Sequence, residues 1–112
     1  LVPIMLNHVN SGKLTLEKLV NLWSYGPERI HRIHNKGRIS LGYDADFTIV
    51  DMNKEMTITN SQQKSRTGWT PYDGMKVKGW PLYTIIRGNI VMREDELLEP
   101  IGKEIQFKET LL

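Results

Sequence analysis

The sequence predicts an α+β protein that is helical over residues 1–36 and β-rich over residues 37–112. In the first part, apolar side chains recur three and four residues apart, which is the period of a helix with one buried face. In the second part, short runs of β-branched and aromatic residues stand between turn-forming residues, as in strands. The chain has 112 residues, 39% of them hydrophobic, so it is long enough for one modest core and too short for two independent domains.

Three helices are expected in the first part. The first begins at residue 1 and stops near Gly12, because glycine suits a left-handed helix end. The second begins after Thr15, whose hydroxyl can cap it, and its apolar face is formed by Leu16, Leu19, Val20 and Trp23. We expect Gly26-Pro27 to end this helix and to begin a third over residues 27–33, since proline at the first helical position loses only a donor that would be unpaired anyway.

Strands are expected over residues 38–41, 46–51 and 55–59. Residues 60–79 are rich in Ser, Gln, Lys, Gly and Pro, which predicts a long loop. Gly88-Asn89 lies between two apolar runs and predicts a β-hairpin with glycine at the first central position of its turn. A short extended piece is expected at residues 105–107.

Charge and composition argue against several classes of protein. Lys and Arg number 15 against 13 Asp and Glu, and the basic residues are scattered, so we expect no nucleic-acid binding. The absence of cysteine excludes disulfides and thiolate metal sites and is compatible with a cytoplasmic location. No apolar run approaches the ~20 residues of a spanning helix, so we expect no membrane insertion. The apolar start at Leu1, without an initiator methionine, predicts that the chain is a piece of a longer protein.

Histidines are the first candidates for a metal site. His31 and His34 are three residues apart and could share one helix face. A site also needs a third ligand, and nothing in the sequence identifies one. We therefore interpret these two residues, and His8, as ordinary, partly exposed histidines.

Two carboxylates are the second candidates. Asp44 and Asp46 point to the same side of an extended chain, where they could hold a hard cation. Gly42 marks a turn just before them, and aspartates in turns accept hydrogen bonds from nearby backbone amides. We favour this structural role over cation binding.

No pattern for nucleophilic catalysis or phosphate binding is present, because the sequence lacks a Gly-x-Ser-x-Gly elbow, a Ser-x-x-Lys motif and a P-loop. Trp69, Tyr72 and Trp80 could form a stacking platform for a ligand, but we favour the interpretation that they anchor the long loop to the core. Taken alone, the residues predict no active site.

The order of several motifs nevertheless resembles a known family. Residues 14–20, 24–30, 36–39 and 42–47 (LTLEKLV, SYGPERI, KGRI and GYDADF) resemble the carboxyl-terminal segment of cyclic amidohydrolases. Residues 68–75, 79–81 and 84–88 (GWTPYDGM, GWP and TIIRG) resemble the dihydroorotase branch in particular. The resemblance covers nearly the whole chain.

The resemblance implies a fold larger than this chain. In that family a metal-dependent (β/α)8 barrel holds a metal centre, usually zinc, and a smaller composite β domain is built from both chain ends. Residues 1–36 would be the last helices of the barrel, and residues 37–112 would be the carboxyl-terminal strands of the small β domain. The β strands would then pair with strands from the amino-terminal part of the parent.

The resemblance also implies an activity for the parent. Members of the dihydroorotase branch catalyse the reversible hydrolysis of dihydroorotate to N-carbamoyl-aspartate in pyrimidine biosynthesis. Their metal ligands are a His-x-His, a lysine that is often carboxylated, two later histidines and an aspartate, and none has a counterpart here. We therefore assign no catalytic, substrate-binding or metal-binding residue, and expect zinc in the parent, none bound by this chain, and no activity of the chain alone.

Two alternatives stay open. The parent could be another cyclic amidohydrolase, such as an allantoinase or a dihydropyrimidinase, or it could be a non-catalytic relative used as a scaffold. The expected partners are the small-molecule substrate of the parent and the remainder of the parent chain, and the isolated chain is expected to self-associate through apolar surface and an unpaired sheet edge.

Overall fold

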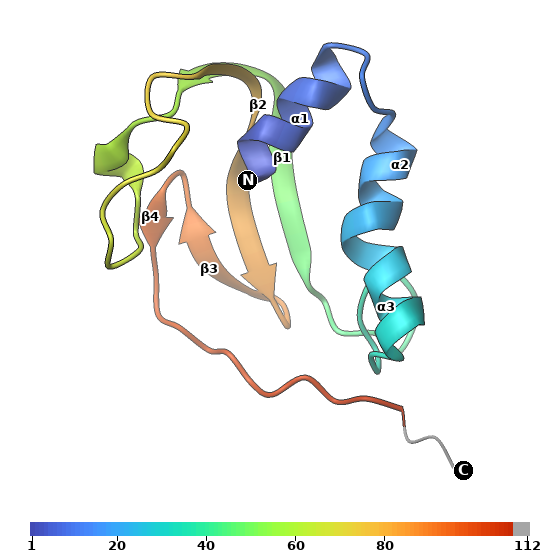
Figure 1. The fold of residues 1–112 in the computed structure, drawn as a ribbon. Helices are drawn as coiled ribbons and strands as arrows, with labels where there is room; N and C mark the ends of the chain where they lie inside the picture. The colour runs from blue at the N-terminus through green and yellow to red at the C-terminus, as the bar shows by residue number, and fades with distance from the viewer. Residues whose placement is uncertain (109–112) are drawn as a thin grey trace.

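The computed structural model describes residues 1–108 as a four-stranded antiparallel sheet with one helix across its face and a helical rod beside that helix (Figure 1). The strands follow one another in the order β1-β2-β3-β4. The helices are α1 Val2–Asn10, α2 Leu16–Val20, the π-helical turn η1 Asn21–Tyr25, α3 Gly26–His31 and the 3₁₀ turn η2 Asn60–Gln62. The strands are β1 Phe47–Thr57, β2 Lys76–Ile86, β3 Asn89–Arg93 and β4 Glu96–Leu97. The prediction of an α+β protein with helices first is confirmed.

The second and third expected helices form one continuous rod. Thr15 caps α2 as predicted, since its hydroxyl accepts a hydrogen bond from the backbone N–H of Lys18. The predicted break at Gly26-Pro27 is wrong, because η1 shifts the backbone bonding and lets the Gly26 N–H reach the Asn21 carbonyl. A Cβ at Gly26 would lie 2.6 Å from that carbonyl oxygen, so only glycine fits this step. The rod ends at His31 rather than residue 33, with Arg32 left-handed.

The strands at residues 46–51 and 55–59 are one strand, β1, which pairs with β2 along both halves. The register shifts between Asp51 and Glu55, where the Asp51 carboxylate accepts hydrogen bonds from the Asn53 and Lys54 amides. This is a β-bulge, and it explains why the sequence pattern is interrupted there.

The strand predicted over residues 38–41 is wrong. Those residues form a turn in which the Tyr43 N–H donates to the Ser40 carbonyl, and they pair with no strand among residues 1–108. The predicted loop at residues 60–79 is shorter than expected, because β2 begins at Lys76.

The predicted hairpin is confirmed, and its turn lies one residue earlier than expected. Its central residues are Arg87 and Gly88, with φ of 45° and 79°, the left-handed pair typical of a type I′ turn. A second hairpin, not expected from the sequence, joins β3 to β4 through Glu94 and Asp95. The extended piece at residues 105–107 is confirmed, and Phe107 forms an isolated antiparallel bridge with Ile33.

The core lies between α1 and the sheet. Its buried members are Ile4 of α1, Ile58 after β1, and Val77 and Trp80 of β2, with Met56 and Met75 packed against them. Leu19 is buried, but the other apolar residues of the rod are largely exposed. Among the described residues, no helix is long and apolar enough to cross a bilayer.

Candidate functional site

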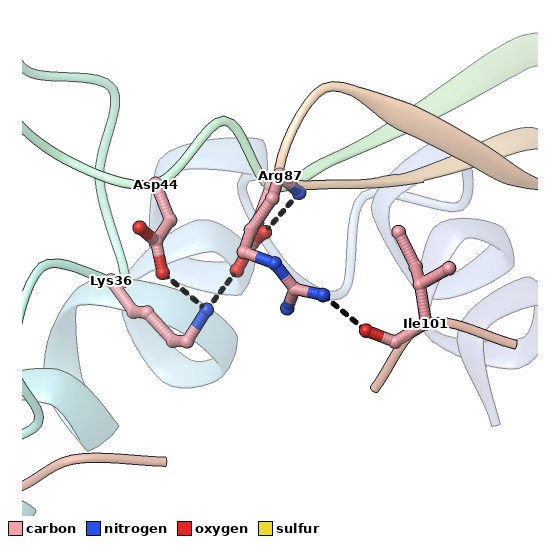
Figure 2. A network of polar contacts seen from close by, with 5 residues as sticks. Lys36, Asp44, Arg87 and Ile101 are labelled. Atoms are coloured by element: carbon pink, nitrogen blue, oxygen red, sulfur yellow. Dashed lines mark hydrogen bonds and ion pairs between the residues drawn. The ribbon is translucent and has the colours of Figure 1, made fainter. Parts of the chain in front are cut away.

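The most concentrated group of charges is the Lys36 cluster, formed by Lys36, Asp44, Asp46 and Arg87. The Lys36 ammonium lies 2.8 Å from the Asp44 carboxylate and 2.6 Å from the Asp46 carboxylate. The other oxygen of Asp46 accepts a hydrogen bond of 2.9 Å from the backbone N–H of Arg87 (Figure 2). The cluster therefore ties the turn after α3 to the β2–β3 hairpin.

Local backbone geometry brings these groups together. Gly37 and Gly42 adopt φ of 89° and 80°, left-handed values that turn the chain back on itself. The Asp44 N–H then donates to the Asn35 carbonyl at 2.9 Å, which sets Asp44 beside Lys36. The cluster thus depends on turn residues that are local in the sequence and on one partner, Arg87, that is distant.

The charges shift two pKa values in opposite directions. Hydrogen bonds to Asp44 and Asp46 raise the pKa of Lys36 above its ordinary 10.5, against the effect of partial burial. Burial of Asp46 acts to raise its pKa, but hydrogen bonds from Lys36 and from the Arg87 amide, with the nearby positive charges, outweigh burial and leave the pKa below 3.8. Both groups are thus held in their charged forms.

This geometry supports the structural interpretation of the two aspartates. An ammonium group, rather than a metal ion, occupies the position between Asp44 and Asp46 that the cation hypothesis proposed. Beside it lies an open pocket of about 180 Å³ lined mainly by polar residues, among them His34, Arg87 and Lys103. Nothing in this pocket pairs a nucleophile with a base.

The three histidines do not converge. His31 ends α3 and is exposed, and His34 lies in the following turn, where its backbone N–H donates to the Gln106 carbonyl. His8 belongs to α1, and its Nδ1 is buried without a hydrogen-bond partner among the described residues. Over residues 1–108, no three His, Asp or Glu side chains gather as metal ligands would.

The aromatic residues divide between the two interpretations. Trp80 is only 6% exposed and its indole N–H donates to Asp95 at 3.2 Å, so it is a core residue as expected, but it belongs to β2 and not to the long loop that it was predicted to anchor. Trp69 and Tyr72 are 60% and 41% exposed, so that role is wrong for them. Hydrogen bonds between polar groups hold their loop instead. The backbone N–H of Asn60 donates to the Asp73 carboxylate, and the side-chain oxygen of Asn60 accepts from the backbone N–H of Thr70.

Glu28 of α3 was not expected from the sequence to be a buried charged residue, and it is only 3% exposed. Its carboxylate faces the Lys108 ammonium at 3.2 Å and the Arg38 guanidinium at 3.5 Å. The Arg38 guanidinium also lies over the rings of Tyr25 and Tyr43. Gly37 packs directly against Glu28, since a Cβ there would lie 2.5 Å from the Cβ of Glu28.

Comparison with known proteins places these features in a family. The protein-family model that is described as "Amidohydrolase family" matches residues 2–91 of this chain. The chain is 48% identical over 108 residues to the dihydroorotase of Pyrococcus furiosus, covering 96% of this chain and 26% of that protein. It is 38% identical over 103 residues to the L-hydantoinase of Paenarthrobacter aurescens, covering 90% of this chain and 22% of that protein.

A solved structure shares the fold. The L-hydantoinase of Arthrobacter aurescens matches with a TM-score of 0.83 and 36% identity over 88% of this chain and 22% of that one. The chain therefore spans about a quarter of the length of the relatives it matches.

Proposed function

Because this chain belongs to the amidohydrolase family, we propose that it is the carboxyl-terminal segment of a dihydroorotase. The observation that carries the proposal is the 48% identity to the Pyrococcus furiosus dihydroorotase over 96% of this chain. The parent would catalyse the reversible hydrolysis of dihydroorotate to N-carbamoyl-aspartate. Its location would be cytoplasmic.

Within the parent, residues 1–36 would be the last helices of a (β/α)8 barrel and residues 37–112 the carboxyl-terminal part of the small β domain. Two features support this division. The rod of α2, η1 and α3 leaves most of its apolar side chains exposed, as a helix does when its covering layer lies elsewhere. The outer edge of β1 pairs with no strand among residues 1–108, so it can accept one from the rest of the parent.

Zinc is the metal that the family resemblance implies, and the described residues do not fit it. No three potential ligands gather over residues 1–108, and the carboxylates of Asp44 and Asp46 already hold the Lys36 ammonium. We therefore assign zinc and its ligands to the remainder of the parent. The part played by this chain is to position helices and strands against the barrel.

A hydantoinase is the second candidate, and a specific observation favours it. The L-hydantoinase relatives match both in sequence, at 38% identity, and in fold, with a TM-score of 0.83. Both candidates open a cyclic amide, so they differ in the ring that the parent accepts.

The test is to express the intact reading frame that contains this chain and to measure ring opening of dihydroorotate, hydantoin, dihydrouracil and allantoin, with zinc determined by metal analysis. We expect turnover of dihydroorotate in preference to the other rings, and zinc bound to the parent. Preference for hydantoin would support the second candidate. Loss of all ring-opening activity in a folded parent that lacks the His-x-His would refute both and support the scaffold alternative.

The 112-residue chain is the matched control in the same assays. We expect it to bind no stoichiometric zinc and to show no turnover. Zinc binding together with turnover by this chain alone would overturn the assignment of the catalytic centre to the rest of the parent.

A further inference from the structure

The segment after β4 leaves the sheet after one more backbone hydrogen bond, from the Leu98 N–H to the Val91 carbonyl of β3. Residues 98–108, which we name the carboxyl-terminal strap, leave β4 and run extended to the end of α3 (Figure 1). The match to the family model ends at residue 91, so the strap lies outside the part that this model covers.

The strap docks through backbone hydrogen bonds of the kind that join strands. The His34 N–H donates to the Gln106 carbonyl at 2.8 Å, and the Lys108 N–H donates to the Arg32 carbonyl at 2.7 Å. Between these two bonds, Phe107 and Ile33 form an antiparallel bridge. The residues after α3 therefore offer a short strand-like edge that the strap occupies.

A buried carboxylate, that of Glu28, also helps to hold the strap. The Glu28 side chain is 4% exposed, so its carboxylate needs a cation or donors close by. Lys108 supplies an ammonium group at 3.2 Å, closer than the Arg38 guanidinium at 3.5 Å. Farther along, the Arg87 guanidinium donates to the Ile101 carbonyl (Figure 2).

The strap contributes almost nothing to the hydrophobic core. No residue from 98 to 108 is buried, and the apolar side chains of Ile105 and Phe107 are 50% and 60% exposed. Opening the strap would therefore break polar bonds and expose a charge, without exposing the core between α1 and the sheet.

We propose that the strap is a releasable latch, held in place by Lys108 on Glu28 and able to open while the sheet stays folded. Its occupant in the closed state is the chain's own residues 105–108.

Hydrogen exchange measures this opening directly, because two amides report on the latch. We compare Lys108→Met with the wild-type chain, following the His34 and residue-108 amides, with the Ile58 amide, which donates to Met75, as the reference for the core. In Lys108→Met we expect the two latch amides to exchange about fivefold faster, while the Ile58 amide is unchanged. The control is Lys103→Met, which removes the same charge from an exposed strap residue.

Three results would overturn the proposal: unchanged latch amides in Lys108→Met, equal acceleration of the Ile58 amide, or the same acceleration in Lys103→Met. If Lys108→Met does not fold, Glu28→Gln replaces it, since this change removes the charge that Lys108 neutralises and keeps the side-chain shape.

Digestion with trypsin tests the opening independently. In Lys108→Met, cleavage after Lys103 should rise relative to cleavage after Arg66, which lies in the exposed 60–74 loop. The same ratio in Lys108→Met and the wild-type chain would count against the latch.

Discussion

Gly79 fixes how closely α1 can approach the sheet. Its φ is 109°, a value that side chains rarely adopt, and a Cβ there would lie 2.7 Å from the Cβ of Leu6. Leu6 is 3% exposed, and its Cβ stands at the root of the side chain, so it cannot rotate away. The close contact of helix and sheet thus requires glycine at this one position of β2.

The substitution Gly79→Ala should lower the free energy of unfolding by about 2–4 kcal/mol, through backbone strain and overlap with Leu6. Urea denaturation followed by tryptophan fluorescence measures the change, since Trp80 is buried in the core. Gly102→Ala is the control, because a Cβ there meets nothing within 4 Å, and it should change stability by less than about 0.5 kcal/mol. Equal effects of the two substitutions would contradict the close approach.

Asp46 gives the Lys36 cluster a predictable pH dependence. Its folded pKa lies below 3.8, so its contribution to stability is present above that value and is lost as the pH falls through the folded pKa. Lys36 has a folded pKa above 10.5, so its contribution is present below that value and is lost as the pH rises through the folded pKa. The contribution of the cluster to stability therefore does not change with pH between these two limits.

Asp46→Asn should lower stability at neutral pH and make the loss of stability below about pH 4 shallower, because one carboxylate that must be protonated on acid unfolding is gone. The measurement is the free energy of unfolding as a function of pH. Glu99→Gln, at an exposed carboxylate, should leave the acid slope as in the wild type. An acid slope that is the same in Asp46→Asn and wild type would show that the cluster contributes nothing to it.

At the scale of elements, two asparagines of α1 complete the pairing of β1 with β2. At the bulge the Asn10 side chain donates to the carbonyls of Met52 at 2.9 Å and Lys78 at 2.7 Å, and the Asn7 side chain accepts from the Lys78 amide at 3.0 Å. Backbone groups that the register shift leaves without strand partners are satisfied by the helix above them. The bulge and α1 are therefore one structural unit.

Asn10→Ala should cost about 1–2 kcal/mol of stability, because two backbone carbonyls lose their donor. Faster hydrogen exchange in the segment around the bulge should accompany the loss. Asn53→Ala, also in the bulge, is the control, since the bond that Asn53 makes to Asp51 comes from its backbone amide, which the substitution keeps. If the Asn53 variant loses as much stability as the Asn10 variant, the helix does not support the bulge.

The elements also show what the sequence can predict. The Thr15 cap and the hairpin at Gly88 were predictable because capping and turn chemistry act within a few residues. The continuous rod through Pro27 and the joining of two strands into β1 were not, since the first depends on the π-helical turn η1 and the second on a β-bulge that Asn10 of α1 supports. The same holds for the site: Asp44 and Asp46 were recognised as a pair, but the partner Arg87 lies 41 residues from Asp46.

At the scale of the whole molecule, apolar surface gathers on the helical rod. Six of its large apolar residues are at least 39% exposed: Leu16, Val20, Leu22, Trp23, Tyr25 and Ile30. So many exposed apolar side chains along one helical rod are typical of a surface that another layer covers. In the proposed parent, the remainder of the chain would provide that layer.

The isolated chain should therefore self-associate, and the rod should be the surface responsible. We expect Val20→Lys combined with Ile30→Lys to lower the associated fraction measured by sedimentation velocity, because each places a charge on a residue that is 52% or 71% exposed on the rod. Ile39→Lys is the control, since Ile39 is 85% exposed but lies outside the rod, and it should leave association unchanged. The same double substitution in the intact parent should reduce activity, because the layer over the rod could then no longer pack. A wild-type chain that stays a monomer of 13.0 kDa at every concentration and unfolds in one sharp transition would show that the rod needs no cover.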